Sequence, residues 1–153
     1  MTTILAFIIV LGVIVMVHEL GHFFAARSVG VRVDRFSIGF PPRLMTITSV
    51  PNGFEIKLFF YRKDQGGKIS WGPIYNWNVK KPGHVGSGTE YCFAIIPLGG
   101  YVKMAGMIDE SMDGTIKNKP YELMSKPVWA QIWVMSAGVI MNILLAFIIF
   151  TGV

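Results

Sequence analysis

The chain has 153 residues, of which 52% are apolar and 15% are charged, whereas a typical soluble domain carries about 25% charged residues. This composition excludes a disordered tail, and a single cysteine, Cys92, excludes a disulfide scaffold. The net charge of +5 indicates little about partners until the distribution of the basic residues is known.

The charged residues are concentrated in the middle of the chain. Residues 1–18 and 127–153 contain none, and all 14 Lys and Arg residues lie between Arg27 and Lys126. Flanking basic residues stay on the cytoplasmic side of a membrane. The distribution therefore predicts a cytoplasmic middle segment, residues 27–126, between two membrane-spanning ends.

The first predicted element is a transmembrane helix within residues 1–26. Residues 4–26 form a stretch of about 35 Å at 1.5 Å per residue, which exceeds a hydrocarbon core of about 30 Å. A cleaved signal peptide is the alternative interpretation. The chain lacks a basic segment at its start, and the apolar residues resume at Phe23 without a small-residue cleavage site.

A polar motif, His18-Glu19-Leu20-Gly21-His22, interrupts this helix. Histidines four residues apart lie on one helix face and can reach one ion, while Glu19 is offset by about 100° and is suited to act as a base. Zinc is the metal that best suits these ligands. A proton relay and a polar helix-packing contact are the alternatives, because ionisable residues inside a membrane helix need a compensating partner.

The middle segment is predicted to contain a small β-sheet. Residues 54–60 alternate in polarity, and residues 91–96 and 101–104 are two further extended pieces separated by Pro97 and a Gly99-Gly100 turn. Backbone near hydrocarbon needs protein or water partners, so the sheet is expected beside the polar motif, where an edge strand holds an extended substrate. For Gly99 and Gly100, a purely structural hairpin is the alternative.

Residues 62–89 are rich in glycine and basic residues and are interpreted as a long insertion. Its aromatic residues, Trp71, Tyr75 and Trp77, suit the headgroup region of a membrane, with the neighbouring lysines near anionic lipid. Three later acids are interpreted as part of a solvated loop and not as metal ligands: Asp109, Glu110 and Asp113.

The last predicted element is a second transmembrane helix at residues 127–153, with Ser125 as its N-cap. Gly138 and Asn142 lie four residues apart, which predicts a stripe of small or polar side chains that favours close helix packing. Packing on the first helix would bring Asn142 towards His22. A packing role alone is the alternative for Asn142. The fold class predicted from these elements is a mainly α membrane protein, in which two transmembrane helices flank a small membrane-associated β-sheet.

Four motifs occur in a fixed order along the chain, and they begin at His18 (HELGH), Phe36 (FSIGF), Ile96 (IPLGGYVKM) and Gly138 (GxxxN). Together they resemble the site-2 protease family of intramembrane metalloproteases, peptidase family M50, and in particular its bacterial RIP metalloprotease branch. The resemblance also implies a re-entrant β element in the membrane.

The resemblance implies roles for individual residues. His18 and His22 are expected to bind zinc, Glu19 to be the catalytic base, and Asn142 to contact the substrate or the site. The substrate-binding residues predicted together with Asn142 are Gly138, Gly99 and Gly100.

The function that the resemblance implies is zinc-dependent cleavage of membrane-spanning proteins in a bacterial inner membrane, with anti-sigma factors and remnant signal peptides as substrates. RNA binding by the aromatic and basic segment is disfavoured, so no nucleic-acid partner is expected. The family's third zinc ligand, an aspartate on a later membrane helix, and its PDZ module lie outside residues 1–153. The chain is therefore expected to be the N-terminal part of a longer enzyme. The alternative is a catalytically inactive adaptor that binds transmembrane helices. A metal or proton transporter is disfavoured, because it predicts further polar residues in the second helix.

Overall fold

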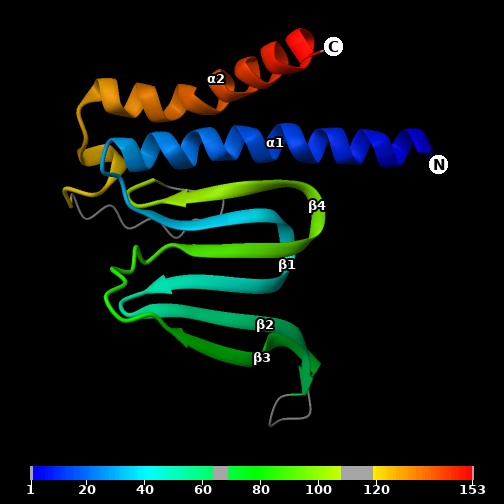
Figure 1. Cartoon of the computed structure of the whole chain (residues 1–153), viewed down its shortest axis with the longest axis vertical. Helices are drawn as coiled ribbons and strands as arrows, with labels where there is room; N and C mark the ends of the chain where they lie inside the picture. Colours follow the sequence, from blue (N-terminus) through cyan, green and yellow to red (C-terminus); the bar gives the residue numbers. More distant parts are fainter. Residues whose placement is uncertain (1, 64–68, 108–118, 153) are drawn as a thin grey trace.

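The computed structural model describes residues 2–63, 69–107 and 119–152. Two long helices lie beside one β-sheet, and both ends of the chain point in the same direction (Figure 1). The elements are α1 (Thr2–Ser28), β1 (Val33–Val50), β2 (Gly53–Lys63), β3 (Ile69–Lys80), β4 (Glu90–Met104), a 3-10 turn (Leu123–Ser125) and α2 (Val128–Gly152).

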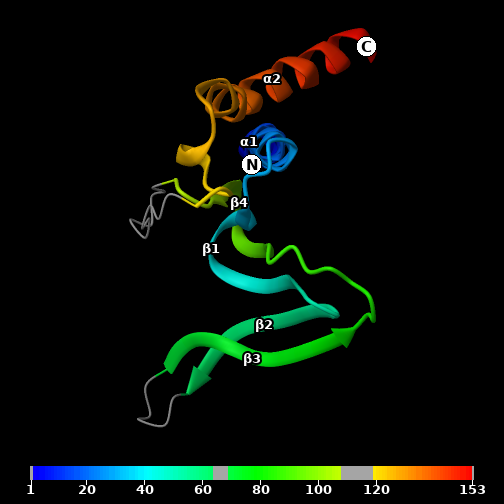
Figure 2. The ribbon, with the colours of Figure 1, turned by 90° about the vertical axis from the view of Figure 1, so that its left-hand side faces the viewer.

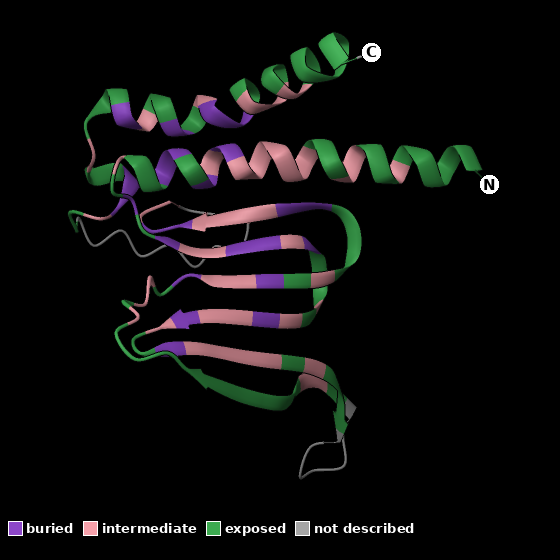
Figure 3. Cartoon of the chain, in the orientation of Figure 1, coloured by how far each residue is buried: buried purple, intermediate pink, exposed green. Residues whose placement is uncertain are grey.

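Both helices are long and apolar enough to cross a membrane, as the sequence predicts. Apart from the polar residues at His18–His22 and Asn142, they are strongly apolar, and few residues of their most apolar stretches are buried by the rest of the chain (Figure 3). A helix with apolar residues on every face is typical of a buried or membrane-spanning segment. Their outward faces therefore suit an apolar surrounding.

The two helices approach closely at Gly21 of α1. A Cβ atom at this position would lie 2.5 Å from the backbone oxygen of Ala137 and 2.8 Å from Cγ of Met141, both on α2. Small residues at a helix crossing allow the two backbones to approach each other. This contact sets the polar motif of α1 against the Gly138 and Asn142 face of α2.

The sheet has the strand order β3-β2-β1-β4 and extends away from the helices (Figure 2). Both β1 and β4 bend back on themselves and interleave. On one side, residues 33–38 of β1 pair with residues 100–104 of β4. On the other side, residues 35–38 pair with residues 90–93, and along this second pairing the residue numbers increase together in both strands. The second half of β1 then pairs with the first half of β4 again, from Arg43↔Ala94 to Thr48↔Glu90.

This interleaving places the last residues of β4 at the edge of the sheet, next to α1 (Figure 1). The bend of β4 reaches the middle of α1, since a Cβ atom at Gly12 would lie 2.7 Å from the carbonyl oxygen of Pro97. The strands of β1 and β4 thus run alongside the apolar stretch of α1 for about half of its length.

The buried core lies where α1 meets the sheet. The rings of Phe23 and Phe36 are 5.3 Å apart, and Tyr91 lies 6.5 Å from Phe36. Leu123 in the 3-10 turn is fully buried and joins this cluster together with Val134 of α2. The core therefore connects both helices to β1 and β4.

The prediction of a mainly α chain is wrong, because the four strands cover about as many residues as the two helices. The sequence pattern does not predict β1, since Pro41 and Pro42 interrupt it and its buried positions do not alternate regularly. The strands expected at residues 54–60, 91–96 and 101–104 are present within β2 and β4.

Two local features also differ from the sequence-based expectations. Part of the glycine-rich segment at residues 62–89 forms β3, which pairs with β2 and carries Trp71, Tyr75 and Trp77. Ser125 does not cap α2, because it belongs to the preceding 3-10 turn and the Pro127 carbonyl accepts the first helical hydrogen bond, from Ala130.

The Leu123→Ala variant is expected to lower the free energy of unfolding by about 2–5 kcal/mol, because it leaves a cavity in a fully buried position. The matched control is Met124→Ala, at a neighbouring side chain that is 44% exposed. Denaturant unfolding in detergent, followed by tryptophan fluorescence, measures both. Equal losses in the two variants would contradict this description of the core.

Candidate active site

His18, Glu19 and His22 lie on the C-terminal half of α1, beside α2 and β4. The helical spacing of four residues brings the two imidazoles together, with their Nε2 atoms 3.1 Å apart and their rings edge to face. Both histidines are partly buried. The structure therefore places two potential ligand atoms side by side, next to a carboxylate.

The orientation of His22 is set by the backbone of α2. Its Nδ1 atom lies 2.7 Å from the carbonyl oxygen of Val134. A carbonyl can only accept a hydrogen bond, so Nδ1 of His22 carries the proton. In the neutral ring, Nε2 then presents its lone pair towards His18, as a metal ligand requires.

His18 is contacted by Asn142 of α2. The Asn142 Nδ2 atom lies 3.2 Å from His18 Nδ1, and the buried Oδ1 atom of Asn142 has no hydrogen-bond partner among the described residues. A half-turn of the amide would place Oδ1 against Nδ1 of His18 as an acceptor. His18 would then carry its proton on Nδ1, and both Nε2 lone pairs would point at the same position.

Gly138 leaves room at this position. A Cβ atom there would lie 2.5 Å from Nε2 of His18 and 2.6 Å from Nε2 of His22. Any side chain at Gly138 would therefore displace the two imidazoles or fill the space between them and α2.

The two nitrogens fit a shared metal ion. Tetrahedral ligands at about 2.0–2.1 Å from zinc are separated by roughly 3.4 Å, close to the observed separation of 3.1 Å. Among the residues that the structure describes, no group of three or more His, Cys, Asp or Glu side chains gathers at one point. Asp109, Glu110 and Asp113 lie outside the described residues.

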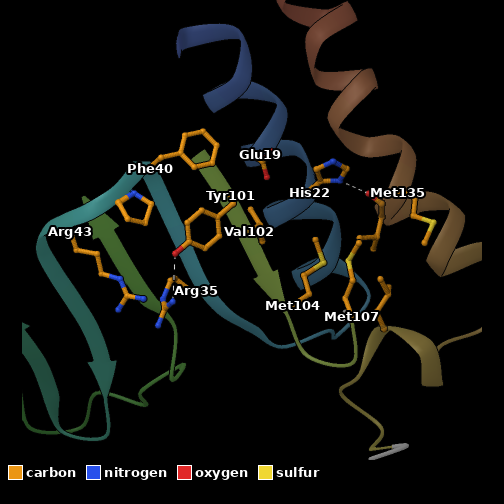
Figure 4. A pocket seen from close by; sticks show the side chains of 13 residues that line it. Glu19, His22, Arg35, Phe40, Arg43, Tyr101, Val102, Met104, Met107 and Met135 are labelled. Atoms are coloured by element: carbon orange, nitrogen blue, oxygen red, sulfur yellow. Dashed lines mark hydrogen bonds between the residues drawn. The ribbon is translucent and has the colours of Figure 1, made fainter. Parts of the chain in front are cut away.

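A cavity of about 740 Å³ opens beside these residues (Figure 4). Glu19 and His22 line it between an arginine-containing end and a methionine-rich end. The backbone amide of Val102 lies close to the Glu19 carboxylate. The last residues of β4 therefore form part of the cavity wall, beside Glu19. The complete lining is Glu19, His22, Arg35, Phe40, Pro41, Arg43, Tyr101, Val102, Met104, Met107, Leu123, Val134 and Met135.

None of the three glycines proposed from the sequence, Gly138, Gly99 and Gly100, belongs to this lining. Gly99, with φ +146°, packs against Val15 of α1, where a Cβ atom would come within 2.9 Å of the Val15 Cγ1 atom. Gly100 lies against the backbone oxygen of Ser37 in the neighbouring strand. The structure thus brings Gly138 and Asn142 to the imidazoles, and gives Gly99 and Gly100 positions of close backbone packing.

No sequence motif marks Arg35 and Arg43, although both line the cavity. Both belong to β1, and their common partner is Glu90 at the start of β4. No short motif joins these three residues, since only the interleaving of β1 and β4 brings them together. The spacing of the methionines at the opposite end of the cavity, Met104, Met107 and Met135, does not predict a shared site either.

The family model and the similar proteins found by comparison indicate the same family. The model of peptidase family M50 matches residues 6–72 and 76–153. Relatives include Protease RseP of Yersinia pestis, 35% identical over 94% of this chain, and Metalloprotease MmpA of Caulobacter vibrioides, 31% identical over 92%. A Vibrio cholerae relative whose name describes a zinc metalloprotease is 37% identical over 93%. The chain spans 23%, 30% and 23% of the lengths of these three relatives, respectively.

His22 is expected to be the Nδ1–H tautomer when neutral, because Nδ1 donates to the Val134 carbonyl. Nitrogen-15 NMR of histidine-labelled protein distinguishes the tautomers by the chemical shifts of the two ring nitrogens. Assignment to His22 comes from the signal that is lost in His22→Gln. A proton found on Nε2 of His22 in metal-free protein would contradict this hydrogen bond.

Proposed function

Because this chain belongs to peptidase family M50, the site-2 protease family, we propose that it carries the catalytic helix of a zinc-dependent intramembrane metalloendopeptidase. The observation that carries the proposal is the pair of imidazole nitrogens, 3.1 Å apart, together with the cavity that His22 and Glu19 both line. The names of the relatives, which describe proteases and zinc metalloproteases, support it. A cavity of this size accommodates a short extended peptide.

The proposed location is a bacterial inner membrane, crossed by α1 and α2, with residues 27–126 on the cytoplasmic side. The outward-facing apolar surface of both helices and the placement of all 14 basic residues between them support this topology. The bends of β1 and β4 would then enter the membrane to about the level of Gly12. Strand pairing continues up to these bends, at Ile38↔Gly100 and Arg43↔Ala94, which limits the unpaired backbone in a nonpolar surrounding.

His18 and His22 would hold the zinc ion, and the remaining protein ligand is proposed to lie beyond residue 153. When bound, zinc supplies Lewis-acid polarisation of the scissile carbonyl and makes hydroxide available near neutral pH. Val134 and Asn142 contact the outer nitrogens of the two imidazoles and so hold the rings in place.

Glu19 would act as the general base. Its position next to His18 on the helix turns its carboxylate into the cavity and not onto the ion. There it would accept a proton from the attacking water and then deliver it to the nitrogen of the leaving amine. The Val102 amide lies beside the carboxylate and would help to hold it in this position.

The substrates proposed are membrane-spanning proteins, with anti-sigma-factor-like proteins and remnant signal peptides as the classes. A Salmonella typhimurium relative named "Regulator of sigma-E protease RseP" supports the first class. A membrane-spanning helix must unwind before water reaches its amide bonds, and the edge of β4 beside Glu19 offers main-chain groups to an extended segment. An inactive adaptor would bind helices through the same surface without using Glu19.

In the full-length protein, Glu19→Gln is expected to lower kcat on a transmembrane substrate by at least about 100-fold, since an amide cannot accept the proton. Zinc content should stay near that of the parent, because both histidines remain. Cleavage is measured by gel assay in detergent and zinc by elemental analysis. Undiminished cleavage in Glu19→Gln would rule out this role, and substrate binding without Glu19-dependent cleavage would favour the adaptor.

Gly138→Ala is expected to remove most of the bound zinc, because the new Cβ atom would occupy the space beside both Nε2 atoms. The matched control is Gly152→Ala on the same helix, where no described atom outside the adjoining residues and the backbone of α2 lies within 4 Å of the added carbon. Elemental analysis and competition with a zinc-sensitive dye measure both variants. Full zinc occupancy in Gly138→Ala would place the metal site elsewhere.

A further inference from the structure

The cavity has a cationic end that the proposed hydrolysis does not use. Arg35 and Arg43, from the two halves of β1, line this end together with Tyr101 of β4 (Figure 4). Both guanidinium groups are paired with a single carboxylate, that of Glu90. Two positive charges against one negative charge leave an excess of positive charge in this cluster.

The two arginines are held differently. Arg35 donates from Nε and Nη2 to Oε2 of Glu90, at 3.0 and 2.9 Å, and its Nη1 atom lies 3.5 Å from the Tyr101 hydroxyl. Arg43 reaches Glu90 through one nitrogen at 3.6 Å, which is longer than a hydrogen bond. Within the described part of the chain this is the one ion pair of Arg43, and its side chain is 33% exposed. Arg43 therefore retains N–H donors for a ligand, whereas Arg35 is fixed.

The opposite end of the cavity is apolar and is lined by Met104, Met107 and Met135 (Figure 4). Methionine side chains are flexible and adapt to apolar groups of varied shape. Glu19 and His22 lie between the two ends (Figure 4). A peptide lying across the cavity would thus present one side chain to the arginines and another to the methionines, with a peptide bond beside Glu19.

We propose that the Arg43 end of the cavity is a specificity subsite for an acidic side chain, Asp or Glu, of the peptide substrate. The proposal rests on the proposed function and names the substrate class that the same site prefers. A guanidinium group binds a carboxylate through two parallel hydrogen bonds, and the excess positive charge of the cluster is compensated when an anion binds.

The spacing along β4 limits where the acidic residue lies. Val102 is next to Glu19, and Tyr101, the adjacent residue on β4, belongs to the cationic end. Residues of a paired extended segment advance by about 3.3 Å each. The acidic residue is therefore expected within about three positions of the cleaved bond.

The test uses the full-length protein in detergent and a set of transmembrane substrates that differ only in one residue, which is Glu, Gln or Lys and is placed at successive positions on both sides of the cleaved bond. At one position, kcat/KM is expected to be about tenfold or more higher for Glu than for Gln. Arg43→Gln should abolish this ratio, and Arg43→Glu should reverse it in favour of a Lys substrate. The matched control is Arg32→Gln, since Arg32 is also paired with a carboxylate, that of Asp34, but lies outside the cavity lining.

Two results would overturn the subsite without affecting the proposed function. One is Glu19-dependent cleavage with equal rates for Glu and Gln at every position. The other is a preference for Glu that survives in Arg43→Gln. Repeating the assay in vesicles with and without phosphatidylglycerol separates the sources of the anion. An Arg43 effect that follows lipid content and not the substrate would mean that the guanidinium binds lipid phosphate. Absence of Glu19-dependent cleavage for all substrates would instead reject the proposed function.

Discussion

The close approach of α1 and α2 is the constraint on which the candidate site depends. Gly21 allows the backbone of α2 to lie against α1, and Gly138 leaves space at the two imidazole nitrogens. Only at this distance does the Val134 carbonyl reach His22 and the Asn142 amide reach His18. A larger side chain at either glycine would separate the groups that orient the imidazoles, so helix packing and site geometry depend on the same contact.

The sheet provides the second half of the site. Because β1 and β4 bend back and interleave, the last residues of β4 become an edge strand beside Glu19, while Arg35, Arg43 and Glu90 gather on the neighbouring ladders. Both bends contain proline, and Gly99 has a positive φ, so β1 and β4 can reverse direction close to the backbone of α1. The sheet therefore combines a main-chain surface for an extended segment with a charged cluster for its side chains.

Polar groups in this protein are satisfied by partners from distant parts of the chain. The Glu90 carboxylate is paired with both Arg35 and Arg43. His22 donates to the carbonyl of Val134, 112 residues away, and the Thr89 hydroxyl donates to the Val33 carbonyl. The one buried side-chain oxygen without a partner among the described residues is Oδ1 of Asn142, beside His18. An unpaired buried acceptor is costly, and a half-turn of the amide would pair this oxygen with the His18 ring.

The sequence alone determines the two apolar helices, the charge distribution and the one-face arrangement of His18 and His22, because these depend on local periodicity. It also carries the family, since the motifs are short and continuous. It does not predict β1, whose prolines and irregular burial hide the strand, or β3 within a glycine-rich segment. The arginine and methionine ends of the cavity depend on pairing between residues 35, 43 and 90 and on helix crossing, which are long-range contacts. Only the tertiary structure decides such contacts, because their energies depend on which distant backbones pack together and not on neighbours in the chain.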